Sequence, residues 1–259
     1  MLIGMETETN TTTNTADKGL IERLFSVGAH FGFTRSRRHP TAKPYIFANK
    51  QGTDIIDLEK SATLLQNAKM LVEEAGRTGK TVLFIGSKEE IKHIVEEEAK
   101  KVEMPFVVNR WVGGMLTNFS EIKKRIARLN DLVAQGESGE LERKYTKKER
   151  VVIGRELNKL QHNFGGIQKM DKLPGMVIVV DPRHESIAVS EANQLSIPVV
   201  AVTSSDADLS RINHPVVVND ALQASVKLVL EELTSAYSTG KSSYVPAKKD
   251  DQKPGRRDR

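Results

Sequence analysis

The sequence predicts an α/β fold, in which a parallel sheet is covered by helices on both faces and a helical hairpin is inserted into the domain. Short apolar runs without polar alternation, such as residues 81–85 and 176–180, are typical of strands buried on both faces. Segments with apolar residues at helical spacing lie between such runs, and repeated β-α units favour a parallel sheet. Residues 119–164 interrupt this pattern with two amphipathic segments and no strand.

Composition limits the classes of protein to which the chain can belong. The 259 residues include no cysteine and carry a formal net charge of +5. One domain with an insertion fits this length, and the absence of cysteine excludes disulfides, thiol catalysis and cysteine-based zinc sites. No apolar run approaches the roughly 20 residues that span a bilayer. Glu6, Glu8 and Asp17 argue against a transit peptide, so we expect a cytoplasmic protein without a membrane partner.

The first part of the chain changes character at about residue 19. Residues 1–18 are rich in Thr and Asn without apolar periodicity, which predicts a disordered tail. Apolar residues at 20–27 predict a short amphipathic helix that ends at Gly28. Residues 45–57 are typical of a small hairpin.

The α/β domain is expected to comprise residues 19–118 and 165–237, with a basic disordered tail at 238–259. Strand order is not predicted by the pattern. We expect helices at 59–75, 91–99, 185–195 and 221–237, and strands at 81–85, 106–108, 176–180, 199–202 and 216–218.

Residues 119–164 have a helical period and two narrow apolar seams. A polar link and the capping-box pattern of Thr146 and Glu149 separate the seams, which predicts an antiparallel coiled-coil arm that projects from the domain. Cations outnumber acids here, so the arm is expected to contact RNA or a neighbouring protein, with Lys123, Lys124 and Arg128 as candidate RNA ligands. The seams are Ile122, Ile126, Leu129 and Val133, and Ile153, Leu157, Leu160 and Phe164.

A basic loop near the N-terminus is the first candidate for nucleic-acid binding. From Arg23 to Thr53 there is no Asp or Glu, while aromatic residues and cations alternate. This combination is typical of surfaces that contact phosphates and unpaired bases, although an ordinary solvated loop is the alternative. The candidate RNA-binding residues are Arg35, Arg37, Arg38, His39 and Lys43.

The stretch VVNRWVGGMLTNFS at residues 107–120 joins a predicted strand to the arm. We expect Arg110 to face RNA or a partner protein and Trp111 to anchor the loop by packing. Gly113 and Gly114 are expected to be needed for their backbone freedom, including positive φ angles, rather than for any ligand. A plain strand-to-helix loop with a core tryptophan is the alternative interpretation.

The predicted strand ends carry residues that an enzyme could use. Asp181, His184 and Asp206 could together hold a metal ion, or Ser204 and His184 could act as nucleophile and base. The sequence has no glycine-rich nucleotide motif, Walker loop or histidine pair at metal spacing, and Gly165-Gly166 is interpreted as the end of the arm. We therefore expect no catalysis, no cofactor, no metal and no small-molecule substrate. A free α/β enzyme or nucleotide-binding module remains the second hypothesis.

Several stretches between residues 20 and 237 carry a family resemblance. They are Gly28-Ala29-His30-Phe31-Gly32, Lys43-Pro44-Tyr45-Ile46-Phe47, Asp57-Leu58-Glu59-Lys60, NRWVGGMLTN at 109–118, Gly165-Gly166-Ile167, and Glu191-Ala192-Asn193 with Ile197-Pro198-Val199. In these the chain resembles the family of the bacterial-type small-subunit ribosomal protein number two. The resemblance implies a flavodoxin-like domain with an inserted helical hairpin.

The same resemblance implies a structural constituent of the small ribosomal subunit. Its implied partners are ribosomal RNA and neighbouring ribosomal proteins, among them the messenger-binding protein number one, which it would help to anchor. The chain departs from the family pattern at Phe33-Thr34 and Arg38-His39, which weakens the expectation for those contacts. It also departs around Asp206 and Asp208, where an acidic ion site would be weaker than in the family.

Overall fold

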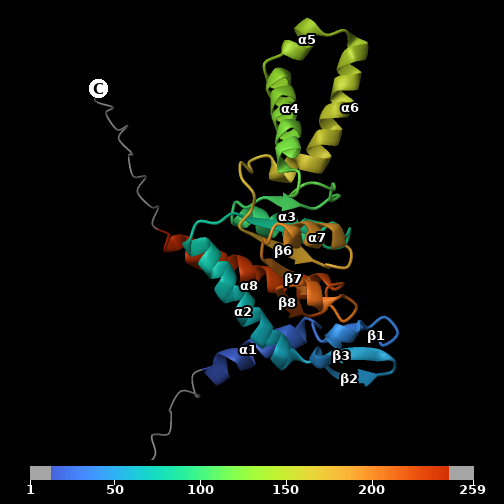
Figure 1. Ribbon diagram of the computed structural model, residues 1–259, viewed down its shortest axis with the longest axis vertical. Helices are drawn as coiled ribbons and strands as arrows, with labels where there is room; N and C mark the ends of the chain where they lie inside the picture. The colour runs from blue at the N-terminus through green and yellow to red at the C-terminus, as the bar shows by residue number, and fades with distance from the viewer. Residues whose placement is uncertain (1–12, 245–259) are drawn as a thin grey trace, which may run out of the picture.

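The core of the molecule is a five-stranded parallel sheet (Figure 1), seen in a computed structural model that describes residues 13–244. The strand order β5-β4-β6-β7-β8 is the 2-1-3-4-5 order of flavodoxin-like folds. This confirms the predicted parallel α/β fold, and each strand lies within two residues of its predicted bounds. The strands are β4 (Val82–Ile85), β5 (Phe106–Val107), β6 (Met176–Val180), β7 (Val199–Thr203) and β8 (His214–Val217).

Helices cover both faces of this sheet because alternate strand residues point to opposite sides. Phe84 and Ile178 pack on one face, in a cluster with α1 (Thr13–Ser26), α2 (Leu58–Arg77), α3 (Lys92–Lys101) and α8 (Gln223–Ser242). Leu83 and Val177 pack on the other face, with α7 (Ser186–Gln194), the loop before the arm and the base of the arm. The arm is therefore joined to the second cluster.

The helices at the two ends of the chain are longer than predicted. Helix α1 begins at Thr13, so residues 13–18, expected in a disordered tail, are helical. Helix α8 continues to Ser242, beyond the last residue of the predicted apolar pattern, because Gly240 lies directly against the backbone of α2. Residues 238–242 are thus helical too, and the rest of the predicted tails, 1–12 and 245–259, lies outside the described residues.

A second, antiparallel sheet carries the basic segment. Its order is β1-β3-β2, from β1 (Phe31–Thr34), β2 (Ile46–Lys50) and β3 (Thr53–Ile56). The predicted hairpin of β2 and β3 is confirmed, with Gln51 and Gly52 at φ angles of 51° and 82° in its turn. Strand β1 was not predicted. It forms by antiparallel pairing with β3. Gly32 has no side chain, so the carbonyl oxygen of Asp54 on β3 can lie close to its backbone.

Two long helices, α4 (Phe119–Glu137) and α6 (Lys147–Phe164), lie side by side at one end of the molecule (Figure 1). The short α5 (Glu140–Lys144) connects them, and both hydrogen bonds of the predicted capping box are present. Leu132 is buried as well, and the predicted Val133 is partly buried against the same cluster. Near the base the seam also packs on the domain, since Ile122, Ile126, Leu160 and Phe164 share a buried cluster with Trp111 and Met115. None of the helices within residues 13–244 has the length and apolar character needed to cross a bilayer.

Candidate nucleic-acid interface

A buried carboxylate organises the loop between β5 and α4. Glu191 of α7 accepts hydrogen bonds from the backbone N–H groups of Gly114, Leu116 and Thr117 at 2.8, 3.0 and 3.1 Å. The indole N–H of Trp111 donates to it at 3.0 Å. Burial raises the pKa of Glu191, but these hydrogen bonds outweigh burial and hold the pKa below its ordinary value. Sequence reasoning missed this role, although Glu191 lay in one of the stretches that carried the resemblance.

The two glycines of this loop differ in their surroundings. Gly114 has a φ angle of 90°, and a Cβ there would lie 3.3 Å from the Cβ of Asn118. Gly113 has no positive φ angle, and a Cβ there would meet nothing within 4 Å. The expectation that both glycines supply a positive φ angle is therefore right for Gly114 and wrong for Gly113. Trp111 is buried, as an anchoring residue should be, and Arg110 is exposed.

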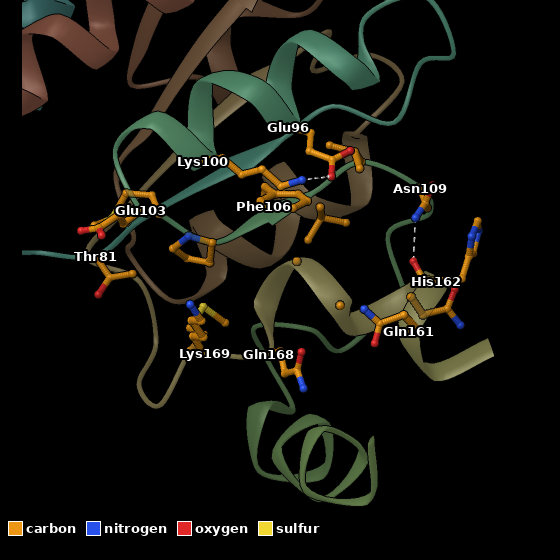
Figure 2. Close-up of a pocket in the computed structure, with 18 of the residues that line it drawn as sticks. Thr81, Glu96, Lys100, Glu103, Phe106, Asn109, Gln161, His162, Gln168 and Lys169 are labelled. Atoms are coloured by element: carbon orange, nitrogen blue, oxygen red, sulfur yellow. Dashed lines mark hydrogen bonds and ion pairs between the residues drawn. The ribbon is translucent and has the colours of Figure 1, made fainter. Parts of the chain in front are cut away.

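The start of the loop is tied to the end of the arm across a large groove (Figure 2). The side-chain amide of Asn109 donates to the carbonyl oxygen of His162 at 2.7 Å. The groove has a volume of about 1140 Å³ and lies between β5 and the segment that follows α6. On its far side Lys100 lies over the ring of Phe106 and pairs with Glu96 at 2.6 Å. Lys92 and Glu103 on this groove are also paired, whereas Lys169, Asp171 and Lys172 have no ion-pair partner in the described part of the chain.

The basic loop presents only part of its predicted set of cations. Arg38 pairs with the buried Asp54 at 3.4 Å. The ring of His39 lies 2.8 Å from the hydroxyl of Thr41 and caps the short 3₁₀ helix Pro40–Tyr45. Both side chains are therefore engaged within the protein, His39 with the neighbouring Thr41 and Arg38 with Asp54, 16 positions away.

Arg35, Arg37 and Lys43 are exposed and have no ion-pair partner among residues 18–244. Arg37 lies over the ring of Phe33, 5.9 Å from its centroid. A cation held by a neighbouring ring costs less conformational entropy to place against a phosphate than a free one does. The loop thus offers three exposed cations, of which Arg37 is held by a neighbouring ring.

The cations predicted on the arm also divide into paired and unpaired ones. Arg128 of α4 donates to both carboxylate oxygens of Glu156 on α6 at 3.2 Å, so it joins the two helices. Its hydrogen bond holds the pKa of Glu156 below the ordinary range. Lys124 pairs with Glu121 at 2.6 Å. Lys123 is exposed and has no such partner in the described part of the chain.

Ser205, next to the strand-end residues that could suit an enzyme, supports the basic segment. The hydroxyl of Ser205 accepts the backbone N–H of Phe33 at 3.0 Å, and its carbonyl oxygen accepts that of His39 at 2.9 Å. The hydroxyl of Ser204 is buried without a hydrogen-bond partner, and His184 is exposed and makes no hydrogen bond to it. Within the described residues no group of three His, Asp or Glu side chains is placed to hold a metal ion.

The carboxylates at these strand ends surround a lysine. The ammonium of Lys88 pairs with Asp181, and Arg183 pairs with Asp206 at 2.7 Å. Asp220 is fully buried, and burial together with the nearby charge of Asp181 raises its pKa to about 7. Lys88 and Asp220 were not among the predicted site residues. At this edge of the sheet, where flavodoxin-like folds bind ligands, two of the carboxylates are thus paired with the protein's own cations.

Comparison with known proteins covers most of the chain. Residues 24–240 match the family model described as Ribosomal protein S2. The small ribosomal subunit protein uS2 of Geotalea uraniireducens (strain Rf4) is 41% identical over 220 residues, which is 85% of this chain and 86% of the relative. That of Nocardia farcinica (strain IFM 10152) is 39% identical over 234 residues, 90% of this chain and 82% of the relative.

Proposed function

The chain belongs to the ribosomal protein S2 family, and from this premise we propose that it is held in place by ribosomal RNA that contacts its basic loop and its arm. It is a structural protein of the small ribosomal subunit, in the cytoplasm, and not an enzyme. The proposal concerns which surfaces bind RNA, and how.

The observation that carries the proposal is the distribution of unpaired cations. Arg35, Arg37 and Lys43 on the basic loop, and Arg110 on the loop before the arm, are exposed without an ion-pair partner in residues 18–244. Exposed cations next to aromatic rings suit phosphate oxygens and unpaired bases. Lys123 extends this set along the arm. Arg38, His39, Lys124 and Arg128 are secondary candidates because each already has a partner within the chain.

The mechanism is neutralisation of phosphates, which positions a protein on folded RNA without reading its base sequence. Each phosphate contact releases condensed counterions, so binding weakens as the salt concentration rises. The rigid sheet below the loop and the arm at the other end of the molecule fix the distance between the two contact regions (Figure 1). Shape then supplies the specificity that charge does not.

Neighbouring ribosomal proteins are the second class of proposed partner, including the messenger-binding protein number one. Exposed aromatic rings on the small sheet support a protein contact in this region, since Phe31 and Phe47 are 49% and 77% exposed. The anchoring role itself is proposed from the family resemblance.

The test is salt-dependent binding of the purified full chain to small subunits that lack this protein. Changing Arg35, Arg37 and Lys43 together to Gln should weaken binding and lower the slope of log affinity against log salt by about one for each lost contact. A charge-matched control changes Arg77, Lys227 and Lys241 to Gln, all of which pair with carboxylates of the α/β domain. An unchanged slope in the loop variant would show that the loop is merely solvated.

A further inference from the structure

Gly113 is a glycine that the folded chain does not itself require. Its φ angle lies outside the left-handed region, and a Cβ at this position would meet no atom within 4 Å. Its neighbour Gly114 has a φ angle of 90°, which strains any other residue. Residue 113 is therefore a place where the backbone is bare and the space beside it is open to a binding partner.

Gly113 lines a groove at the base of the arm. The groove has a volume of about 520 Å³ and lies between the loop before α4 and the facing surfaces of α4 and α6. Buried side chains of Ile122, Leu160 and Phe164 form its floor. A side chain on residue 113 would project into the open space beside it.

The charges around this groove leave an excess of unpaired cations. Of its two carboxylates, Glu121 pairs with Lys124 at 2.6 Å and Glu156 binds Arg128. Arg125 and Lys159 also line the groove, are exposed, and have no ion-pair partner among the side chains that the structure describes. An occupant that complements this rim carries negative charge.

We propose that this groove holds the sugar-phosphate backbone of a ribosomal RNA strand, which passes over the bare backbone of Gly113. Arg125 and Lys159 contact phosphates from the two helices of the arm. The side-chain amides of Asn118 and Asn163, which also line the groove, offer donors and acceptors for phosphate and ribose hydroxyl groups. The inference rests on the proposed function, because it assumes that RNA binds the protein, and it adds a defined binding site at the arm's base.

The first experiment compares the two glycines. Gly113→Ala and Gly113→Leu should melt at the wild-type temperature, whereas Gly114→Ala should melt lower because its positive φ angle is strained. Gly113→Leu and wild type then compete for small subunits that lack this protein. We expect about tenfold less of the variant than of wild type in the assembled subunits, because the leucine side chain would occupy the space of the RNA strand. Incorporation of Gly113→Leu at the wild-type level would overturn the proposal.

The second experiment identifies the occupant. Arg125→Gln and Lys159→Gln should each reduce the salt slope of binding by about one, whereas the control Lys227→Gln on α8 should leave it unchanged. If Gly113→Leu blocks incorporation while both charge variants keep the wild-type slope, the groove holds a protein and the proposal is wrong.

The two proposals fail in different ways. A wild-type protein whose incorporation showed no dependence on salt would contradict RNA binding as a whole. If wild type is salt-dependent, the basic-loop variant is weakened and the three groove variants behave as wild type, only the groove proposal is lost.

Discussion

The indole N–H of Trp111 donates to the carboxylate of Glu191 at 3.0 Å, where both side chains are buried. The two residues are 80 positions apart, on the loop before α4 and on α7. The same carboxylate accepts the backbone N–H groups of Gly114, Leu116 and Thr117. One buried charge thus satisfies several backbone donors of the loop, so α7 determines the shape of the loop from which the arm departs.

Loss of either partner should lower the free energy of unfolding. Trp111→Phe removes the indole N–H and keeps an aromatic ring, and should cost about 1.5–3 kcal/mol, as expected for a hydrogen bond to a charged group. Trp111→Ala also removes the buried ring and should cost about 3–5 kcal/mol. Denaturant unfolding of the full chain measures both values. A Trp111→Ala protein that unfolds like wild type yet fails to join the small subunit would make the ring a recognition surface instead.

The stability should depend on pH through Glu191. Its pKa in the folded protein is lower than the ordinary 4.5, so its stabilising contribution is complete above about pH 4.5 and is lost as the pH falls through the folded pKa. Glu191→Gln should be less stable than wild type at pH 7, and the difference should shrink under acid conditions. Unfolding free energies measured from pH 3 to 7 test this. Parallel curves for the two proteins would mean that Glu191 does not titrate in this way.

Asp220 should have the opposite pH dependence. Its carboxyl loses a proton near 3.8 in the unfolded chain but near 7 in the folded protein, so the stability that it contributes at low pH is lost between these values. Asp220→Asn imitates the protonated form and can still accept the N–H of Ser204. The variant should exceed wild type in stability by on the order of 4 kcal/mol above pH 7 and approach it below pH 4. Equal stability at pH 8 would contradict the raised pKa.

The contact between α2 and α8 should tolerate no side chain at its glycines. A Cβ on Gly240 would overlap the carbonyl oxygen of Glu73, so Gly240→Ala should destabilise by about 1–3 kcal/mol. Gly154 in α6 provides the matched control, because a Cβ there would meet no atom within 4 Å. Gly154→Ala should stabilise the protein by about 0.5–1 kcal/mol through its helix propensity. Thermal melting of both variants distinguishes steric overlap from a general effect of replacing glycine.

The arm should be removable only above its base. Replacing residues 130–155 by a short glycine linker should leave cooperative unfolding intact, because Ile122, Ile126, Leu160 and Phe164 would still cover Trp111 and Met115. Removing residues 120–163 would expose that cluster and should destabilise the domain. Equal stability of the two truncated proteins would indicate that the arm packs independently of the domain. Denaturant titration of both proteins gives the comparison.

The spacing of apolar residues was sufficient to predict most of the helices and strands, because each of these elements buries residues at a regular interval along the chain. The buried runs at β4, β6 and β7 lack alternation, and the parallel sheet follows from their spacing with helices between them. The ends of α1 and α8 were not predictable in this way. Gly240 is a poor helix former by local propensity, and only its packing against α2 explains why the helix continues through it.

The sequence by itself determined the parallel α/β class, the place of the helical interruption and the presence of cations in the basic loop and the arm. These properties follow from residue types and their spacing. Only the tertiary structure decided which cations are free, because Arg38 and Arg128 find acidic partners 16 and 28 positions away. It also decided that Glu191 shapes the loop and that Gly113 opens onto a groove. Long-range partners are set by how elements pack, and no local pattern carries that information.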